Sequence, residues 1–239
     1  MVTARPSRDA SRERHGSLLA ALGTAVVSGS LPPGSVLTLE GMCAEYAVSR
    51  SVAREAVRVL ESMGLLSSRR RVGVTVLPRT SWNVFDPRVI GWRLASSDRV
   101  DQLLSLSELR RGVEPVAAAL AAERATAEQS RALAAAVVDM EVHGRAGELE
   151  PYLRADQAFH RTLLEASGNE MLAALSGLVA EVLDGRTHHG LMPARPNPEA
   201  VALHDAVARA VRGGDAAGAE QAMRSIIDEA SAAVSEMDS

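Results

Sequence analysis

Apolar residues recur at helical spacing through almost the whole chain after Asp101, with glycine-rich breaks between the segments. Aromatic residues make up only 3% of the chain, so a core has to be built from Ala, Leu and Val. Such a composition favours packed helices over an aromatic-rich β-sandwich. We therefore expect a mostly α fold, with helices over residues 103–124, 127–142, 149–166, 171–183, 198–211 and 216–234.

The first eighty residues show short apolar stripes that alternate with turn residues. One helix is predicted over residues 17–27, and a second, short one over 40–46 after a proline- and glycine-rich turn. Ser49 can cap a third helix that runs to Met63. Its buried stripe is expected to be Val52, Ala56, Val59, Leu60 and Met63. Two strands, 65–68 and 72–76, then surround three consecutive arginines, which predicts a hairpin with a basic tip.

Charge is distributed unevenly along the chain, although its sum is only −4. Residues 1–80 hold 11 arginines and six acidic residues, a net charge of +5, and the remainder holds 15 arginines and 24 acidic residues, a net charge of −9. We expect a basic domain over residues 1–80 with a flexible tail over 1–15, a linker over 81–98, and an acidic all-α domain over 99–239.

Cellular location can be inferred from what the sequence lacks. Cys43 is the only cysteine, which excludes an internal disulfide and a thiolate zinc site. No apolar run reaches the length of a membrane-spanning helix, and the N-terminus has no apolar signal segment. A cytoplasmic protein without a membrane partner is expected.

Arg50, Arg54 and Arg58 recur every fourth residue, so they line one face of the third predicted helix. Such a helix fits the major groove of DNA, where arginine can hold a guanine edge by two hydrogen bonds. Ser49 and Ser51 lie at the helix N-terminus, where a phosphate is favoured. Alternatively, the face is merely solvated, with Arg54 and Arg58 paired to acidic neighbours. The order helix, turn, helix, basic hairpin favours a winged helix-turn-helix, in which each part contacts DNA.

Three polar residues lie on apolar faces of the acidic domain. Asp156 and His160 are one turn apart among inward-facing residues, and His204 has a similar place on a later helix. Burying a carboxylate is unfavourable without a compensating cation or hydrogen bonds. Two interpretations remain open, a divalent metal site and a structural Asp–His hydrogen bond.

The sequence VSRSVAREA at residues 48–56, followed by LESMGL at 60–65, resembles the GntR family of bacterial transcription regulators. The resemblance implies that Arg50 and Arg54 contact bases or phosphates and that Ser49 and Ser51 contact the DNA backbone. It assigns Arg70, Arg71 and Gly73 to the wing, which approaches the minor groove. Glu40 departs from the family pattern, because many members have arginine there.

The acidic domain resembles the FCD, or FadR-type, ligand-binding bundle, through ELR at 108–110, VEP at 113–115, LAAERAT at 120–126, and Asp156 with Phe159 and His160. That bundle commonly holds a divalent metal such as zinc through one Asp and three His, and an organic acid completes the coordination. Asp156, His160 and His204 match three of these positions, whereas the fourth is Ile226, which cannot ligate. His188 and His189 are candidates to replace the missing ligand, and His188 is also a candidate to contact the effector.

Arg110 matches an arginine that can pair with a ligand carboxylate in such bundles; an Arg110–Glu114 helix pair is the alternative. The segment 82–94 resembles the linker of regulators of the galactonate-operon type, and Trp82 and Trp92 are expected to pack it onto the domains. Together these resemblances cover residues 17–235.

The resemblance implies a homodimeric, ligand-responsive repressor that binds a palindromic operator, associates with the nucleoid through it, and is released by a small sugar acid, an aldonate such as galactonate. Two other classes are weighed against it. One is a metal-dependent enzyme built on Asp156, His160 and His204, but no nucleophile motif or general base beyond these residues is evident. The other is a protein-interaction bundle with a vestigial DNA-binding domain.

Overall fold

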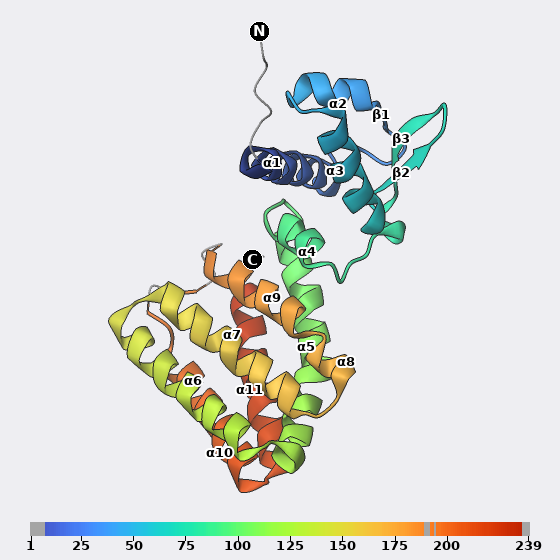
Figure 1. Cartoon of the computed structure of the whole chain (residues 1–239). Helices are drawn as coiled ribbons and strands as arrows, with labels where there is room; N and C mark the ends of the chain where they lie inside the picture. The colour runs from blue at the N-terminus through green and yellow to red at the C-terminus, as the bar shows by residue number, and fades with distance from the viewer. Residues whose placement is uncertain (1–7, 189–191, 194, 236–239) are drawn as a thin grey trace. The chain divides into compact units, whose positions relative to one another are not determined.

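The computed structural model is mostly helical and describes residues 8–188, 192–193 and 195–235 (Figure 1). Contacts within the chain define two compact units, which divide after Asp98. A mostly α fold was predicted and is confirmed. Among the described residues, no helix is both long and apolar enough to cross a membrane.

The first unit combines five helical segments with a three-stranded antiparallel sheet. Its elements are α1 (Arg8–Val27), β1 (Val36–Leu37), α2 (Leu39–Glu45), α3 (Arg50–Ser62), β2 (Leu66–Arg69), β3 (Gly73–Val76), the 3-10 turn η1 (Arg79–Ser81) and α4 (Pro87–Leu94). The strand order is β1-β3-β2, with Ser67 and Val36 each paired to the central strand. The hairpin β2–β3 was predicted; the short strand β1 was not. Helix α1 begins at Arg8 and not near Ser17 as expected.

Helix α3 follows a serine cap, as the sequence predicted. The Ser49 hydroxyl accepts a hydrogen bond from the Val52 amide, which satisfies one of the free donors in the first turn. The side chains that α3 buries are Ala53, Ala56, Val57, Leu60 and Met63. Val52 and Val59, also predicted in this stripe, are half-buried and pack against the same core, and Ala53 and Val57 are buried in addition.

The segment between the basic hairpin and Asp98 contains a helix, α4, which the sequence analysis treated as linker. Asp86 caps it and Pro87 occupies its first position. The Trp92 ring lies so close to Gly23 of α1 that no Cβ fits there. Trp82 donates its indole N–H to the Leu77 carbonyl oxygen at 3.3 Å. Both tryptophans pack against the core of the first unit, as expected.

The second unit is an all-α bundle. Its helices are α5 (Arg99–Arg124), α6 (Ala127–Ala146), α7 (Leu149–Ala166), α8 (Glu170–Ala173), α9 (Ser176–His188), α10 (Pro198–Gly213) and α11 (Ala216–Ser235). Thr126 and Gln129 form a reciprocal capping box at the start of α6. The single helix expected over 171–183 is instead α8 and α9, and the break at Ala174 carries neither Gly nor Pro.

The core of the bundle positions the polar residues singled out above. Ala118, Ala121, Phe159, Leu163, Val207 and Met223 belong to one buried cluster that joins α5, α7, α10 and α11. The Phe159 ring contacts His160 and His204 edge-to-face, with ring centroids 5.7 and 4.9 Å away, and the two imidazole centroids are 5.4 Å apart. This packing fixes the two imidazoles from different helices in one place.

Candidate functional site

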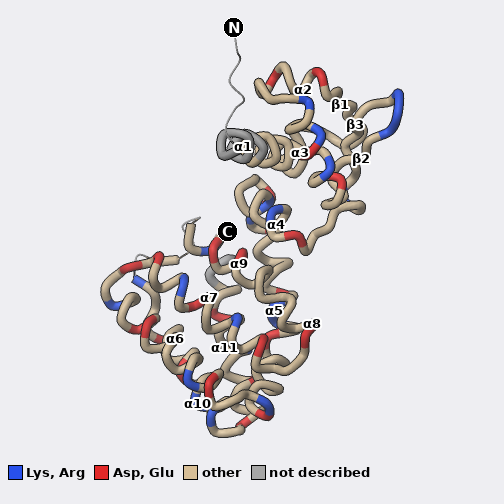
Figure 2. The backbone as a smooth tube through the Cα atoms, in the orientation of Figure 1, with Lys and Arg blue, Asp and Glu red and all other residues tan. Residues whose placement is uncertain are grey.

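The exposed face of α3 carries three arginines. Arg50, Arg54 and Arg58 are all exposed, and a run of positively charged residues also forms the tip of the β2–β3 hairpin (Figure 2). Arg50 donates to Glu40 of α2 at 2.8 Å, and Arg58 lies 3.6 Å from Glu55. Arg54 makes no ion pair with any residue that the structure describes. The face is therefore partly paired, and Arg54 remains open to a ligand.

The hairpin tip places two further arginines beside α3. Arg70 and Arg71 are exposed in the β2–β3 turn, where Arg71 adopts a left-handed backbone with φ 69°. Gly73 has φ 113°, and a Cβ there would lie 2.8 Å from the Leu37 carbonyl oxygen, so the close approach of β1 requires glycine. A groove between α3 and this hairpin is lined by Arg54, Arg58 and residues 69–71.

Two hydrogen bonds hold this surface in shape. The Glu61 carboxylate of α3 accepts from the backbone amide of Ser68 in β2, which fastens the hairpin to the helix. At the helix N-terminus, the Ser49 and Ser51 hydroxyls lie 2.9 Å apart and both residues are exposed. Glu61, an acidic neighbour of Arg54 and Arg58 along the helix, forms no ion pair with either of them among the described residues and instead positions the hairpin.

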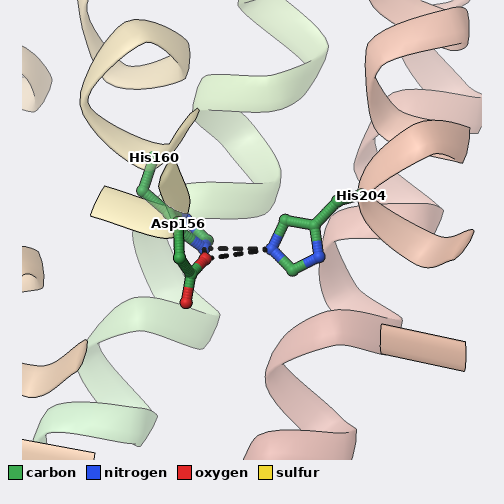
Figure 3. Close-up of side chains that lie close together, drawn as sticks. All are labelled: Asp156, His160 and His204. Carbon is green, nitrogen blue, oxygen red and sulfur yellow. Dashed lines mark hydrogen bonds and ion pairs between the residues drawn. The ribbon is translucent and has the colours of Figure 1, made fainter. Parts of the chain in front are cut away.

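The second unit brings Asp156 and His160 of α7 together with His204 of α10 (Figure 3). Asp156 Oδ1 lies 3.3 Å from Nε2 of each histidine, and the two Nε2 atoms are 3.4 Å apart. All three residues are buried. The three donor atoms thus form a nearly equilateral triangle inside the protein.

Each imidazole turns its other nitrogen toward an acceptor. His160 Nδ1 lies 2.7 Å from Glu114 Oε2, and His204 Nδ1 lies 2.7 Å from the Ala200 carbonyl oxygen. In a neutral imidazole these acceptors favour the ring proton on Nδ1 and a lone pair on Nε2, although the His160–Glu114 contact lacks the geometry of a good hydrogen bond. The sequence analysis did not connect Glu114 with His160; the only available signal was a glutamate on the buried side of the first bundle helix.

Glu114 is fully buried and also holds Arg110. Arg110 Nε donates to Glu114 Oε1 at 2.5 Å and its NH2 donates to Oε2 at 3.3 Å, while NH2 lies 3.5 Å from His160 Nε2. Burial alone would raise the pKa of Glu114, but the Arg110 charge and the contact with His160 outweigh it and lower the pKa to about 2. The Arg110–Glu114 pair is therefore present, and Arg110 also lines the cavity described below; its contact with a ligand carboxylate stays a prediction.

The pKa values of His160 and Asp156 are shifted by the same cluster of charges. Burial would lower the pKa of His160, but Glu114 and Asp156 outweigh it and the pKa is raised. Burial would raise the pKa of Asp156, and its contacts with His160 and His204 instead lower it well below the ordinary range. Both carboxylates therefore stay ionised and favour a positive charge beside them, either a proton on His160 or a metal ion that takes its place.

The triangle has the dimensions of a tetrahedral metal site. Ligand atoms about 2.0–2.1 Å from a tetrahedral ion lie about 3.3–3.4 Å from one another. The three measured separations, 3.3, 3.3 and 3.4 Å, match this spacing. Asp156 Oδ1 is buried without a hydrogen bond of good geometry, as expected for an atom that faces an ion. The residues present therefore fit a divalent metal.

A cavity of about 70 Å³ adjoins the triangle. Its walls include Arg110, Tyr152, Arg186, Ile226 and Glu229 in addition to Asp156, His160 and His204. Ile226, at the position of the family's missing histidine, is part of this wall. The structure does not bring His188 here: it is exposed, 2.6 Å from Glu150 and 3.3 Å from Asp184. His189 lies outside the described residues.

Replacing Glu114 by glutamine is expected to destabilise the second unit by about 3–5 kcal/mol at neutral pH, because Arg110 loses its counter-charge inside the bundle. The Glu114 pKa is lowered from 4.5 to about 2, so its stabilising effect is complete above about pH 4.5 and disappears as the pH falls toward 2. Urea unfolding of Glu114→Gln at several pH values measures this. Exposed Glu123→Gln on α5 is the control; equal losses in both variants would contradict the prediction.

Comparison with known proteins adds to this geometry. Residues 16–76 match the family "Bacterial regulatory proteins, gntR family", and residues 105–229 match the FCD domain. The chain is 32% identical over 208 residues to the galactonate operon transcriptional repressor of Escherichia coli K12, covering 86% of this chain and 90% of that protein. It is 31% identical over 207 residues to the HTH-type transcriptional regulator LutR of Bacillus subtilis, covering 83% and 90%.

Solved structures show the same fold. The chain resembles E. coli McbR/YncC with a TM-score of 0.56, 16% identity and complete coverage of both chains. It resembles Lar, which controls the Listeria monocytogenes agr system, with a TM-score of 0.59, 17% identity, and 98% and 99% coverage.

Proposed function

Because this chain belongs to the GntR family of bacterial regulatory proteins and carries an FCD domain, it is a transcription regulator and not an enzyme, and we propose that it is a homodimeric repressor released from its operator by a small sugar acid. We place its action in the bacterial cytoplasm, on an operator in the nucleoid. The observation that carries the effector part of this proposal is the polar cavity beside Asp156, His160 and His204. An aldonate such as galactonate is the proposed effector, since the similar E. coli protein represses a galactonate operon.

The first unit supplies the DNA-binding surface in this proposal. Arg54 and Arg50 of α3 contact base edges or phosphates in the major groove, and Ser49 and Ser51 contact the backbone where α3 begins. To reach DNA, Arg50 has to leave Glu40, which is inexpensive because both side chains are about two-thirds exposed, at 66% and 68%. Glu40 therefore orients Arg50 without blocking it.

The β2–β3 hairpin acts as the wing. Arg70 and Arg71 extend from its tip toward the minor groove, and Gly73 lets the hairpin backbone fold closely against β1. The Glu61–Ser68 hydrogen bond keeps the wing at a fixed distance from α3. A symmetric dimer presents two such surfaces, which is why a palindromic operator is proposed.

In the second unit, Asp156, His160 and His204 would hold a divalent ion, for which zinc is our candidate. When bound, the ion would supply open coordination positions for an oxygen of the effector. Glu114 and the Ala200 carbonyl oxygen orient the two imidazoles, and Arg110 neutralises Glu114. Because Ile226 cannot ligate, a coordination position on the cavity side would stay open to the effector.

Effector binding changes the shape of the FCD domain because the cavity is small. Ligand pockets generally enclose about 300–1,000 Å³, whereas this cavity measures about 70 Å³. A sugar acid therefore has to separate the surrounding helices before it fits. A ligand that binds the widened form better shifts the dimer toward the geometry with lower affinity for operator DNA.

The decisive experiment is operator release. DNA protected in footprinting upstream of the protein's own gene serves as the target, and its affinity is measured by fluorescence anisotropy with and without D-galactonate. Galactonate is expected to lower operator affinity, and neutral galactitol is expected to have no effect. If no DNA is protected, the interaction-bundle alternative is favoured; if DNA is protected but galactonate and other aldonates change nothing, the effector assignment is wrong.

A further inference from the structure

Two arginines line the cavity, and they differ in their partners. Arg110 is committed to Glu114 by two hydrogen bonds. Arg186 of α9 has a buried Nε atom without a hydrogen-bond partner, and its guanidinium makes no ion pair with any residue in the described ranges. Arg186 is thus an available cation at the cavity wall.

The surroundings of Arg186 disfavour a charge that stays alone. Burial lowers the pKa of Arg186, the positive charge of Arg110 lowers it further, and the carboxylates of Asp156 and Glu229 compensate only in part, so that the pKa stays below its ordinary value. A buried cation without a close counter-ion costs stability. An anionic group that enters the cavity removes this cost, and carboxylate and guanidinium match as planar, bidentate partners.

Glu229 of α11 and Tyr152 of α7 set the character of the rest of the ligand. Glu229 lines the same cavity and forms no ion pair within the described part of the chain. A carboxylate accepts hydrogen bonds from hydroxyl groups and repels a second carboxylate. Burial raises the pKa of the Tyr152 hydroxyl far above its usual range, so this group stays a neutral donor. One cation, one anion and one phenol suit a monocarboxylate that carries hydroxyl groups.

We propose that Arg186, and not Arg110, is the counter-ion for the effector's carboxylate, and that Glu229 selects hydroxylated monocarboxylates over dicarboxylates. This inference rests on the proposed effector function of the FCD domain. It assigns different tasks to the two arginines. Arg110 supports the Glu114–His160 pair, and Arg186 recognises the ligand.

The proposal is tested by calorimetric titration of the full-length protein, both as purified and after zinc loading. The probes are D-galactonate, the dicarboxylate galactarate and neutral galactitol. Arg186→Gln is expected to weaken galactonate binding about 10- to 100-fold, since hydrogen bonds to charged groups are lost. Arg186→Lys should recover part of the affinity. Arg161→Gln, which removes an exposed arginine of α7, should bind as the wild type does. Glu229→Gln should improve galactarate binding relative to galactonate.

Unfolding of the ligand-free protein provides a second readout that separates ligand recognition from structural support. Arg186 is half-buried and makes no described ion pair, so its replacement in Arg186→Gln is expected to leave the unfolding midpoint unchanged or raised. A strongly lowered midpoint, or a variant that does not fold, would show that Arg186 supports the fold and would overturn the proposal. Wild-type galactonate affinity in Arg186→Gln would overturn it equally.

Operator binding distinguishes failure of this inference from failure of the proposed function. If Arg186→Gln loses galactonate binding, and galactonate bound to the wild type does not release operator DNA, the arginine assignment stands and the effector function fails. If galactonate releases the operator from both proteins at the same concentration, the effector function stands and the assignment to Arg186 is wrong. If the wild type binds neither galactonate nor galactarate, the carboxylate site itself is refuted.

Discussion

Replacing Arg50 and Arg54 together by alanine is expected to lower operator affinity by at least about 30-fold, the largest loss that any pair of substitutions in the first unit should cause. A bidentate arginine–guanine contact contributes about 1–3 kcal/mol, so losing two of them costs about 2–6 kcal/mol. Arg54 contributes without competition from an acidic partner in the described structure, whereas Arg50 first gives up Glu40. The single variant Arg54→Ala should therefore lose more affinity than Arg50→Ala.

Anisotropy titration with the footprinted operator and with a scrambled duplex, both at moderate salt, measures this loss. The matched control is Arg209→Ala with Arg212→Ala, which removes the same charge from exposed positions on α10. The control should bind the operator as the wild type does. Unchanged discrimination between operator and scrambled DNA in the Arg50, Arg54 double variant would remove the main support for base recognition by α3.

The second large effect concerns metal content. The purified wild type should carry about one divalent ion per chain, and Asp156→Ala or His204→Ala should carry almost none, because a site with three protein ligands does not survive the loss of one. Elemental analysis by mass spectrometry measures the ion directly. His143→Ala is the control, since His143 is a partly exposed histidine paired with Glu148 on the bundle surface.

Ile226→His adds an independent test of the same site. Because Ile226 belongs to the cavity wall next to the triangle, a histidine there can supply a fourth ligand, and the ion should then leave more slowly in the presence of a chelator. A wild-type protein that contains no ion and takes up none from solution would contradict the metal assignment. In that case Asp156, His160 and His204 would form a metal-free polar cluster.

The features predicted correctly from the sequence are those that depend on residues within one or two helical turns of each other. The Ser49 cap, the spacing of Arg50, Arg54 and Arg58, and the Asp156–His160 pair one turn apart all depend on helix geometry alone. His204 lies on the inward face of another helix. Its contact with Asp156 and His160 is consistent with the rule that a buried polar group needs a polar partner. The structure bears out their proximity, while their ligand remains a proposal.

Other features depend on tertiary contacts, which leave no periodic pattern in the sequence. The expected stripe of α3 was correct at Ala56, Leu60 and Met63 but missed Ala53 and Val57, because the exact width of a buried face depends on the helices packed against it. The Glu114–His160 contact joins residues 46 positions apart in two helices. Arg186 looked like an ordinary charged residue near a helix end, and only its buried Nε shows that it differs from the surface arginines.

The packing of Trp92 over Gly23 has a practical consequence for domain exchange. Since α4 is fastened to α1, the DNA-binding module includes α4 and extends to the short connection that follows Leu94, well past the hairpin. A chimera that joins this module to another sensor should be cut between Ala95 and Arg99. A junction near Thr80 would strip Trp92 from the module and expose the apolar side of α1, so such a chimera is expected to aggregate before its response can be assayed.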